Sequence, residues 1–222
     1  MNVLVTGGTG TLGRHVVMLL RQSGHRARIL SREPRGHVDA VQGDLKSGTG
    51  LGKAVMGMGG IVHAATGARE SMASRAADHR TKFRAEAIVR EDLVPWSILR
   101  ATQFHDLIEI VLGGFTRLPG VAAIPFRWQF QPVDTREVAQ RVVDVVLQEP
   151  AGMLPDFGGP EVRDFESIAE SWLKARKRNR RLINLKLPFR FSRQFAEGIL
   201  TCPDHKDGKI TFDQYLQEKY AP

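Results

Sequence analysis

A glycine-rich turn close to the N-terminus has the residue spacing best suited to chemistry. The run TGGTGTLG, residues 6–13, fits G-x-G-x-x-G from Gly8 and T-G-x-x-G-x-x-G from Gly7. Glycine lets the chain turn tightly, lets an anion approach the backbone and lets a helix pack closely on a strand. We therefore predict that this turn binds the pyrophosphate of a dinucleotide, through Gly7, Thr9, Gly10, Thr11, Leu12 and Gly13.

The turn needs a strand before it and a helix after it. Residues 2–5 are mostly apolar and strand-favouring, which predicts the strand. Leu12, Val16, Leu19 and Leu20 repeat at helical spacing, and Gly24 is placed to end that helix. The helix N-terminus would then present free N–H groups to the anion. The alternative is a glycine-rich surface turn that binds no ligand.

The end of the second predicted strand, residues 27–31, bears on which dinucleotide is bound. An acidic residue at this point suits the ribose 2′-hydroxyl of NAD, and a basic one suits the 2′-phosphate of NADP. Ser31 and Arg32 supply a hydroxyl and a guanidinium, which favours NADP. Glu33 favours NAD if the strand ends later, and a solvated Arg32 is the third interpretation.

Two further strand ends predict the rest of the dinucleotide site. Residues 38–41 form a strand followed by Asp44, which could accept from the adenine amino group, and Leu45, which could lie against the ring; Asp44 could also cap the next segment. Residues 50–58 predict a weak helix, and 61–67 a fourth strand. Small residues at its end leave room for the dinucleotide: Ala64, Ala65 and Thr66. His63 is interpreted as a packed strand residue rather than a catalytic base.

Composition limits the class of protein. The chain has 222 residues, 42% hydrophobic, one cysteine and a net charge of +8. These values predict one α/β domain with a small appended lobe and no disulfide. The first strand is too short for a signal peptide and no apolar run spans a bilayer, so we expect a cytoplasmic protein. The positive charge could indicate a nucleic-acid or an anionic-membrane partner. It is not carried on a nucleic-acid-binding motif, so we favour an arginine-rich soluble protein that binds anionic nucleotides.

The later chain predicts further elements and few chemical groups. Strands are expected at 96–100, 126–133 and 153–157, and helices at 107–115 and 165–177. Asp134 and Glu137 resemble a capping box. The basic run 174–191 could bind phosphate, RNA or an anionic membrane surface, and we favour its interpretation as a solvated helix end. Residues 203–214 lack the acidic ligands of a calcium loop. Pocket walls are predicted at Gln103, Phe104 and His105.

These pieces resemble the short-chain dehydrogenase/reductase superfamily, in its atypical NmrA-like branch, which includes relatives of the nucleotide-binding accessory subunit of respiratory complex I. The resemblance spans nearly the whole chain. The motifs that carry it are VTGGTGTLG (5–13), RILSR (28–32), QGDL (42–45), VHAAT (62–66), TKFRAEAIVRE (81–91), PWSILRATQF (95–104), QPVDTREVA (131–139), DFGGPE (156–161) and CPDHKDGKITFDQYL (202–216).

The resemblance breaks between Thr66 and Thr81. It implies a helix, a fifth strand, and a tyrosine four residues before the lysine that matches Lys82. That position is Asp78 here, and about fifteen residues cannot hold a helix, a strand and two loops. We expect one helix over 76–92 that leads directly into strand 96–100, so that the sheet closes up by one strand. A damaged fold is the alternative. The catalytic residues stay unknown.

The sequence thus predicts a doubly wound, parallel-sheet Rossmann fold with one helix–strand unit shortened. Residues 1–150 would form the NAD(P)-binding domain and residues 151–222 a small substrate-side lobe. If the chain is active, the resemblance implies an NADPH-dependent oxidoreductase that acts on a carbonyl or quinone. The missing tyrosine favours a non-catalytic redox sensor or assembly subunit instead. A truncated product is the third alternative, and no metal is expected.

Overall fold

The structure, a computed structural model, describes residues 1–34, 36, 39–65, 86–91, 93–117 and 119–221. The chain divides into two compact units. The first unit holds Met1–Leu99 and Ala139–Leu154, and the second holds Arg100–Val138 and Pro155–Pro222. Each unit is described separately below. The expectation that residues 1–150 form a domain apart from 151–222 remains a prediction.

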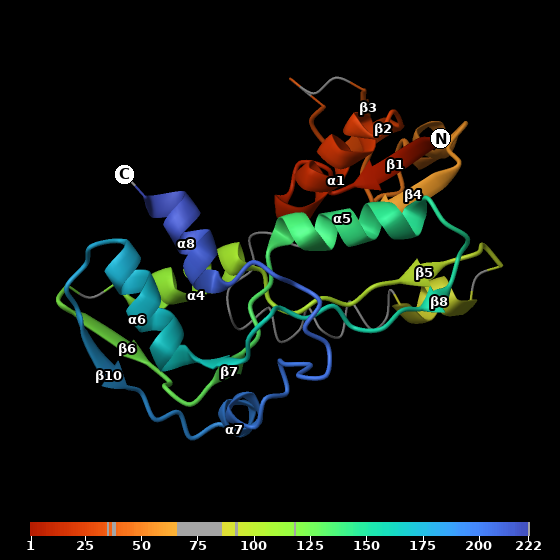
Figure 1. Cartoon of the computed structure of the whole chain (residues 1–222). Coiled ribbons are helices and arrows are strands. Elements are labelled where there is room, and N and C mark those ends of the chain that lie inside the picture. The colour runs from red at the N-terminus through yellow and green to blue at the C-terminus, as the bar shows by residue number, and fades with distance from the viewer. Residues whose placement is uncertain (35, 37–38, 66–85, 92, 118, 222) are drawn as a thin grey trace. The chain divides into compact units, whose positions relative to one another are not determined.

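A parallel sheet forms the centre of the first unit (Figure 1). Its strand order is β3-β2-β1-β4, the arrangement of one half of a doubly wound fold. Helix α1 connects β1 to β2, and α2 connects β3 to β4. The elements are β1 (Asn2–Thr6), α1 (Thr11–Gln22), β2 (Arg26–Ser31), β3 (Ala40–Gln42), α2 (Leu51–Val55) and β4 (Gly60–His63). The predicted α/β Rossmann-like fold is confirmed.

Alternate residues of β1 pack on opposite faces of this sheet, as the period of a strand requires. Val3 and Val5 are fully buried in one cluster. That cluster draws on α1 and on α5 (Thr135–Val146) through Val16, Val17, Leu20, Ala139 and Val143. Leu4 packs on the other face with Leu30 and with Ala54 of α2. The sheet is therefore covered on both faces around its central strand.

Strand β5 (Ser97–Ile98) pairs in parallel with β8 (Gly152–Met153) in a separate two-stranded sheet. Among the described strands β4 pairs only with β1, so the continuous, closed-up sheet that we predicted is not borne out there. Strand β5 has only two residues and already pairs with β8, so it could form few backbone hydrogen bonds with another strand such as β4. Residues 86–91 are helical, whereas Thr66, Asp78 and Lys82 lie outside the described residues.

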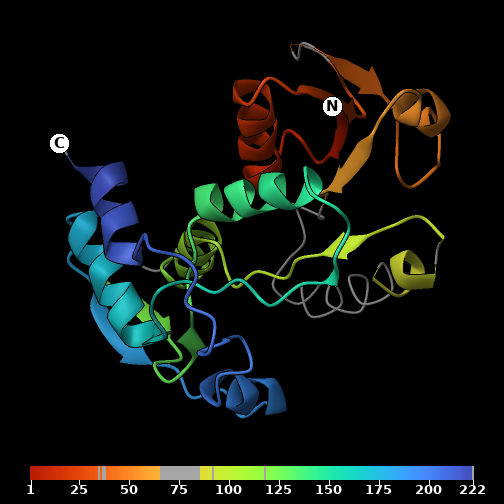
Figure 2. The ribbon, with the colours of Figure 1, turned by 45° about the vertical axis from the view of Figure 1, so that its right-hand side comes forward.

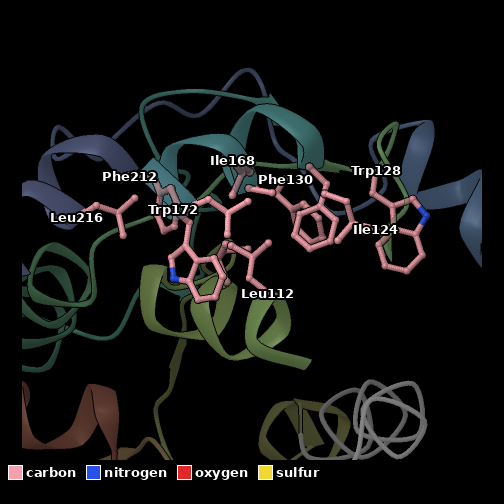
Figure 3. Packing of buried hydrophobic residues seen from close by; sticks show 12 residues of the cluster. Leu112, Ile124, Trp128, Phe130, Ile168, Trp172, Phe212 and Leu216 are labelled. Atoms are coloured by element: carbon pink, nitrogen blue, oxygen red, sulfur yellow. The ribbon is translucent and has the colours of Figure 1, made fainter. Parts of the chain in front are cut away.

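The second unit is built around a core rich in aromatic side chains (Figure 3). Phe165, Ile168 and Trp172 are fully buried on one face of α6, as their helical spacing predicts. Facing them are residues of α4, β6 and α8, and Figure 2 shows α6 beside α8. The elements are α4 (His105–Phe115), β6 (Val121–Ile124), β7 (Gln129–Phe130), β9 (Arg163–Asp164), α6 (Phe165–Ala175), β10 (Arg181–Asn184), α7 (Arg190–Ala196) and α8 (Phe212–Tyr220).

Two predictions about this unit are wrong, the second only in part. Residues 126–133 do not form one strand, because the chain turns at Trp128, whose N–H donates to the Pro125 carbonyl. The basic run is a helix end only at its start. Lys174 lies exposed in the last turn of α6, which stops at Ala175, whereas residues 181–184 form β10, which pairs in parallel with β6. Strand β6 has the sequence VAAI, and alanine is a poor strand former, so local pattern did not predict the pairing.

No helix among the described residues is long and apolar enough to cross a bilayer. The described part of the chain also contains no group of three or more histidine, cysteine or acidic side chains placed to hold a metal.

Candidate dinucleotide-binding site

The backbone of the turn shows which of the two glycine patterns applies. Gly7 has a φ of +70°, a conformation that glycine adopts without strain. A Cβ added to Gly7 would lie 2.7 Å from the Ala65 Cα. The Gly10 N–H donates to the Gly7 carbonyl at 2.9 Å and closes the turn. The tight turn is therefore at Gly7, and the pattern is T-G-x-x-G-x-x-G.

Gly13 brings helix α1 against this turn. A Cβ built on Gly13 would lie 2.1 Å from the Gly7 carbonyl oxygen and 2.7 Å from the Gly8 Cα. Both atoms belong to the backbone, so no side chain could move aside. Only glycine allows the first turn of the helix to lie this close to the end of β1.

Gly10 lies at the helix N-terminus and leaves it open. It is the N-cap of α1, no side chain caps the helix, and the first turn holds no acidic residue. Among the described residues, a Cβ on Gly10 would meet only the Gly7 carbonyl oxygen, at 3.2 Å. The first N–H groups of a helix have no intrahelical partner, and with the helix dipole they favour an anion. These residues fit a pyrophosphate.

The predicted ribose-side residues lie at the end of β2. The Ser31 hydroxyl donates to the Glu33 carbonyl at 2.9 Å and accepts from the Glu33 N–H at 3.2 Å, which makes a local turn. Arg32 and Glu33 are exposed. The structure thus places the hydroxyl in the turn itself, and it leaves the guanidinium of Arg32 at the surface beside the strand end.

Asp44 and Leu45 follow β3 as expected. An Asp44 carboxylate oxygen accepts from the Lys46 N–H at 2.9 Å, and the Asp44 N–H donates to the Thr49 carbonyl. Asp44 therefore caps this local turn, whereas the N-cap of the next helix, α2, is Gly50. Among the described residues, no partner is found for the second carboxylate oxygen of Asp44. Leu45 is 44% exposed, so an apolar face is present at this strand end.

The end of β4 approaches the glycine turn closely. Ala64 donates its N–H to the Thr6 carbonyl at 3.1 Å. Thr6 and His63 are register partners on β1 and β4, and the Thr6 hydroxyl lies 2.8 Å from His63 Nδ1. Burial lowers the pKa of His63. The interpretation of His63 as a hydrogen-bonded strand residue agrees with this contact. The sequence did not predict the contact between Thr6 and His63, because the two residues lie 57 positions apart.

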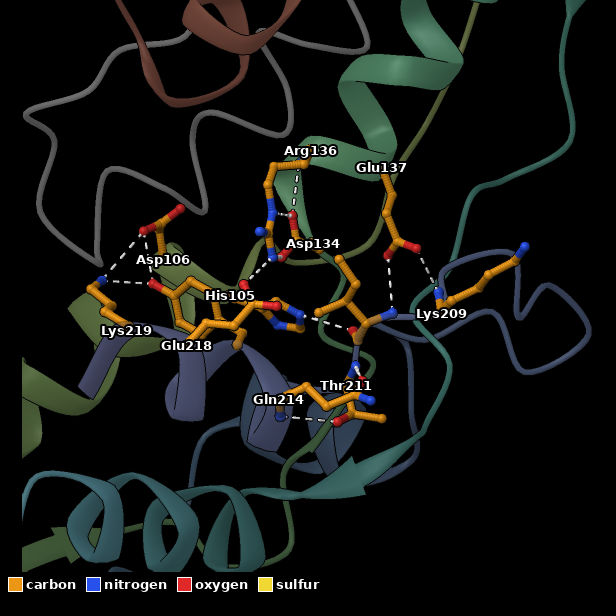
Figure 4. Close-up of polar contacts among 12 residues, drawn as sticks. His105, Asp106, Asp134, Arg136, Glu137, Lys209, Thr211, Gln214, Glu218 and Lys219 are labelled. Atoms are coloured by element: carbon orange, nitrogen blue, oxygen red, sulfur yellow. Dashed lines mark hydrogen bonds and ion pairs between the residues drawn. The ribbon is translucent and has the colours of Figure 1, made fainter. Parts of the chain in front are cut away.

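In the second unit, the three residues predicted as pocket walls are engaged within the unit, and Figure 4 shows His105 among its neighbours. Gln103 donates to the Leu200 carbonyl at 2.7 Å and accepts from the Gln131 N–H. Phe104 is the N-cap of α4. His105 is 1% exposed, and its Nε2 lies 3.1 Å from the Ile210 carbonyl, so Nε2 carries a proton. Burial lowers the pKa of His105, which makes it a neutral core residue.

The predicted capping box at α5 is half correct. Asp134 caps the helix, since its carboxylate accepts from the Arg136 N–H at 2.8 Å. The Glu137 carboxylate instead accepts from the N–H groups of Lys209 and Ile210 (Figure 4). In a capping box the Glu137 carboxylate would accept from the N–H of the N-cap residue. Here the two N–H groups from the later chain are its partners instead.

One buried carboxylate in the second unit gave no signal in the sequence. Glu109 of α4 accepts from Trp172 Nε1 at 2.9 Å, from the Tyr215 hydroxyl at 2.7 Å and from the Tyr220 hydroxyl at 2.5 Å. Lys219 also donates to it. Its side chain is 9% exposed. Glu109 thus joins α4 to α6 and α8, and a role in the second unit's stability follows.

The fold is that of an α/β protein with a Rossmann-like parallel sheet, and comparison with known families gives one match in the part of the chain that holds the glycine turn. Residues 3–96 match the model of the NAD dependent epimerase/dehydratase family. This stretch contains β1, β2, β3 and β4 and the whole glycine turn. No curated protein matches the chain. The family match covers less than half of the chain.

Solved structures with the same fold cover nearly the whole chain. A nucleoside-diphosphate-sugar epimerase from Staphylococcus aureus is 15% identical, with a TM-score of 0.68, covering 98% of this chain and 100% of that one. An NADPH-dependent quinone oxidoreductase from Escherichia coli is 14% identical, with a TM-score of 0.72 and coverage of 98% and 99%. UDP-N-acetylglucosamine 4-epimerase from Bacillus cereus is 16% identical, with a TM-score of 0.69 and coverage of 99% and 95%.

Proposed function

We propose that this protein binds NAD(P), with NADPH as the favoured form. The observation that supports this most directly is the geometry of the turn. Gly7 makes the reversal at a φ of +70°, Gly10 leaves the N-terminus of α1 uncapped, and Gly13 brings the helix onto the strand end. All three are what a pyrophosphate requires of its binding turn.

The remaining contacts are assigned along the carboxyl edge of the sheet. Arg32 would hold the 2′-phosphate through its guanidinium. Ser31 would join it by turning its hydroxyl from the Glu33 carbonyl to a phosphate oxygen. Asp44 and Leu45 would hold the adenine. The small end of β4 would line the path of the dinucleotide with Ala64, Ala65 and Thr66, of which Thr66 lies outside the described residues.

The activity that we propose is NADPH-dependent reduction of a carbonyl or quinone, by a member of the NmrA-like branch. When bound, the cofactor supplies the hydride; this chain's residues would bind and orient it. The similar fold of the Escherichia coli quinone oxidoreductase supports this class of substrate. We further propose a cytoplasmic location, which cell fractionation would test.

A non-catalytic dinucleotide sensor or assembly subunit is the second candidate. One observation favours it: the residue four before Lys82 is Asp78, where the resemblance implies a proton-donating tyrosine. Aspartate has no phenolic hydroxyl, so the tyrosine that the resemblance implies is missing from this position. The intact turn supports both candidates equally.

Two measurements separate these candidates. Titration of NADPH and NADH, followed by nucleotide fluorescence, should show saturable binding, and no saturation with either would refute both. NADPH oxidation is then followed with quinones and small carbonyls. Turnover supports the reductase. Binding without turnover, unchanged by Lys82→Ala, supports the sensor.

Arg32→Ala is expected to weaken NADPH binding by about 10-fold or more and NADH binding much less. The reason is that a charge-assisted hydrogen bond to phosphate contributes about 1.5–3 kcal/mol. The measurement is the ratio of the two dissociation constants. Arg26→Ala is the matched control, since Arg26 is an exposed arginine at the opposite end of the same strand. Equal losses of NADPH and NADH would contradict the assignment to the 2′-phosphate.

A further inference from the structure

The positive charge of this protein is concentrated in one short segment. Residues 174–193 contain nine lysine and arginine residues and no acidic residue. The rest of the chain therefore has 23 basic and 24 acidic residues, a net charge of −1, against +8 for the whole. The excess charge is a local property of this segment rather than of the protein's surface in general, so its electrostatic field is local as well.

The same segment exposes large apolar side chains. Helix α7 (Arg190–Ala196) has no buried residue. Phe189 is 56% exposed and Phe191 44% exposed, and their rings stack with centroids 5.4 Å apart. Ile183 on β10 and Ile199 after α7 are also exposed. Exposed apolar groups of this size beside cations mark an interaction surface.

The apolar and cationic side chains meet in one open groove of the second unit. Phe126, Arg127, Lys186, Phe189 and Arg193 line it. Arg193 pairs with Glu197 at 2.8 Å. Within the described part of the chain no ion pair is found for Arg127, Lys186 or Arg190. Most of the positive charge at this groove is therefore available to an external anion.

Buried contacts hold this surface on the core of the unit. Trp128, which is 3% exposed, donates its Nε1–H to the Ser192 hydroxyl of α7 at 2.9 Å. The Trp128 ring also packs edge-on against Phe195 at 5.0 Å. The outer side chains of α7 are thus presented from a fixed position, which lowers the ordering cost of binding.

We propose that this surface, which we call the basic–aromatic face and define as residues 183–199 with Arg127, docks on an anionic phospholipid bilayer. Exposed phenylalanine and isoleucine side chains enter the headgroup boundary, and the flanking cations pair with lipid phosphates. Because the face carries cations without an ion pair among the described residues, a partner with complementary charge is anionic. The proposal is independent of the dinucleotide site.

The ring geometry favours a bilayer over a single-stranded nucleic acid. Nucleic acids need free ring faces on which bases stack. Phe189 and Phe191 lie nearly parallel, at 9°, so that each covers a face of the other. Phe191 also contacts Trp128 and Phe195. The isoleucines add apolar volume but no stacking surface. This combination suits insertion between lipids.

The test is co-sedimentation of the full chain with vesicles at physiological ionic strength. Binding to phosphatidylcholine vesicles that contain phosphatidylglycerol is expected, and no binding to phosphatidylcholine alone. Lys186→Glu with Arg190→Glu should weaken binding about 30-fold, since each cation near an anionic surface contributes about a fivefold effect. Phe189→Ser with Phe191→Ser should weaken it about 10-fold.

The control reverses two charges elsewhere. Lys53→Glu with Lys206→Glu changes two exposed lysines outside the segment and gives the same net charge as the test variant. It should bind vesicles as the wild-type chain does. An equal loss in the control, or equal binding to neutral vesicles, would overturn the proposal. So would displacement from anionic vesicles by a single-stranded oligonucleotide, which would assign the face to nucleic acid.

A reporter variant gives an independent result that does not depend on loss of binding. Phe189→Trp places an indole at an exposed site. Its emission should shift to shorter wavelength with anionic vesicles, because the ring enters a less polar environment. Unchanged emission while the protein sediments with the vesicles would mean that this face does not contact the bilayer, and would overturn the proposal. Circular dichroism checks that each variant is folded.

Discussion

Gly13→Ala is expected to abolish dinucleotide binding and to destabilise the first unit by about 3 kcal/mol or more. The added Cβ would lie 2.1 Å from the Gly7 carbonyl oxygen. That oxygen and the Gly8 Cα, 2.7 Å from the added Cβ, are backbone atoms that cannot turn aside. Helix α1 must therefore move away from the end of β1, and its N-terminal N–H groups move with it. The measurement is NADPH titration together with urea unfolding. An affinity within threefold of wild type would contradict the assigned turn.

Gly52→Ala is the matched control for that substitution. Gly52 lies in α2 of the same unit, and a Cβ there meets no atom within 4 Å. Replacing an unhindered helical glycine with alanine stabilises by about 0.5–1 kcal/mol. A small gain in stability with unchanged NADPH binding is expected. The contrast between two glycine-to-alanine changes in one unit isolates the close backbone approach at Gly13.

Glu109→Ala is expected to destabilise the second unit by about 3–4 kcal/mol. The substitution leaves the indole N–H of Trp172 and the hydroxyl of Tyr220 without their acceptor. The Tyr215 hydroxyl and Lys219 each lose one of their acceptors and keep Asp106. Unfolding in urea, followed by tryptophan fluorescence, measures the change. Glu109→Gln is the matched control, because it retains an acceptor oxygen and the side-chain volume, and it should lose about half as much.

The contribution of Glu109 to the free energy of unfolding should also depend on pH. Burial raises the pKa of Glu109, but the bonds from Lys219, Tyr220, Tyr215 and Trp172 outweigh it and hold the pKa below its ordinary value of 4.5. A carboxyl group whose pKa is lower in the folded state stabilises fully above its unfolded pKa. The stability difference between wild type and Glu109→Gln should therefore be constant near neutrality and shrink as the pH falls below 4.5. A difference that grows in acid would contradict this.

Local requirements explain why the sequence predicted the first unit well. A strand, a glycine turn and an amphipathic helix are each set by residues a few positions apart, and Gly7, Gly10 and Gly13 each meet a separate physical need within that span. The parallel sheet follows from the alternation of such units. The proposed dinucleotide contacts at Arg32 and Asp44 come from the same logic, and they stay predictions.

Long-range pairing explains what the sequence did not predict in the second unit. Strand β6 pairs with β10 about 60 residues later, and neither has a strong strand pattern by itself. The donors to Glu109 come from positions 63 to 111 residues away. His105 illustrates the same limit. A histidine before an apolar helix predicts an exposed acid–base group as readily as a buried one, and only the contacts with Ile210 and Phe212 decide.

The order in which the chain is synthesised bears on how the first unit forms. Its core includes Ala139 and Val143 of α5, which follow 39 residues that belong to the other unit, Arg100–Val138. A nascent chain that has emerged only as far as β5 therefore still exposes the part of one apolar sheet face that α5 covers in the finished unit. Contacts of this sequence separation form late, and a half-made sheet is prone to aggregate. During translation, completion of this unit has to wait until α5 has left the ribosome.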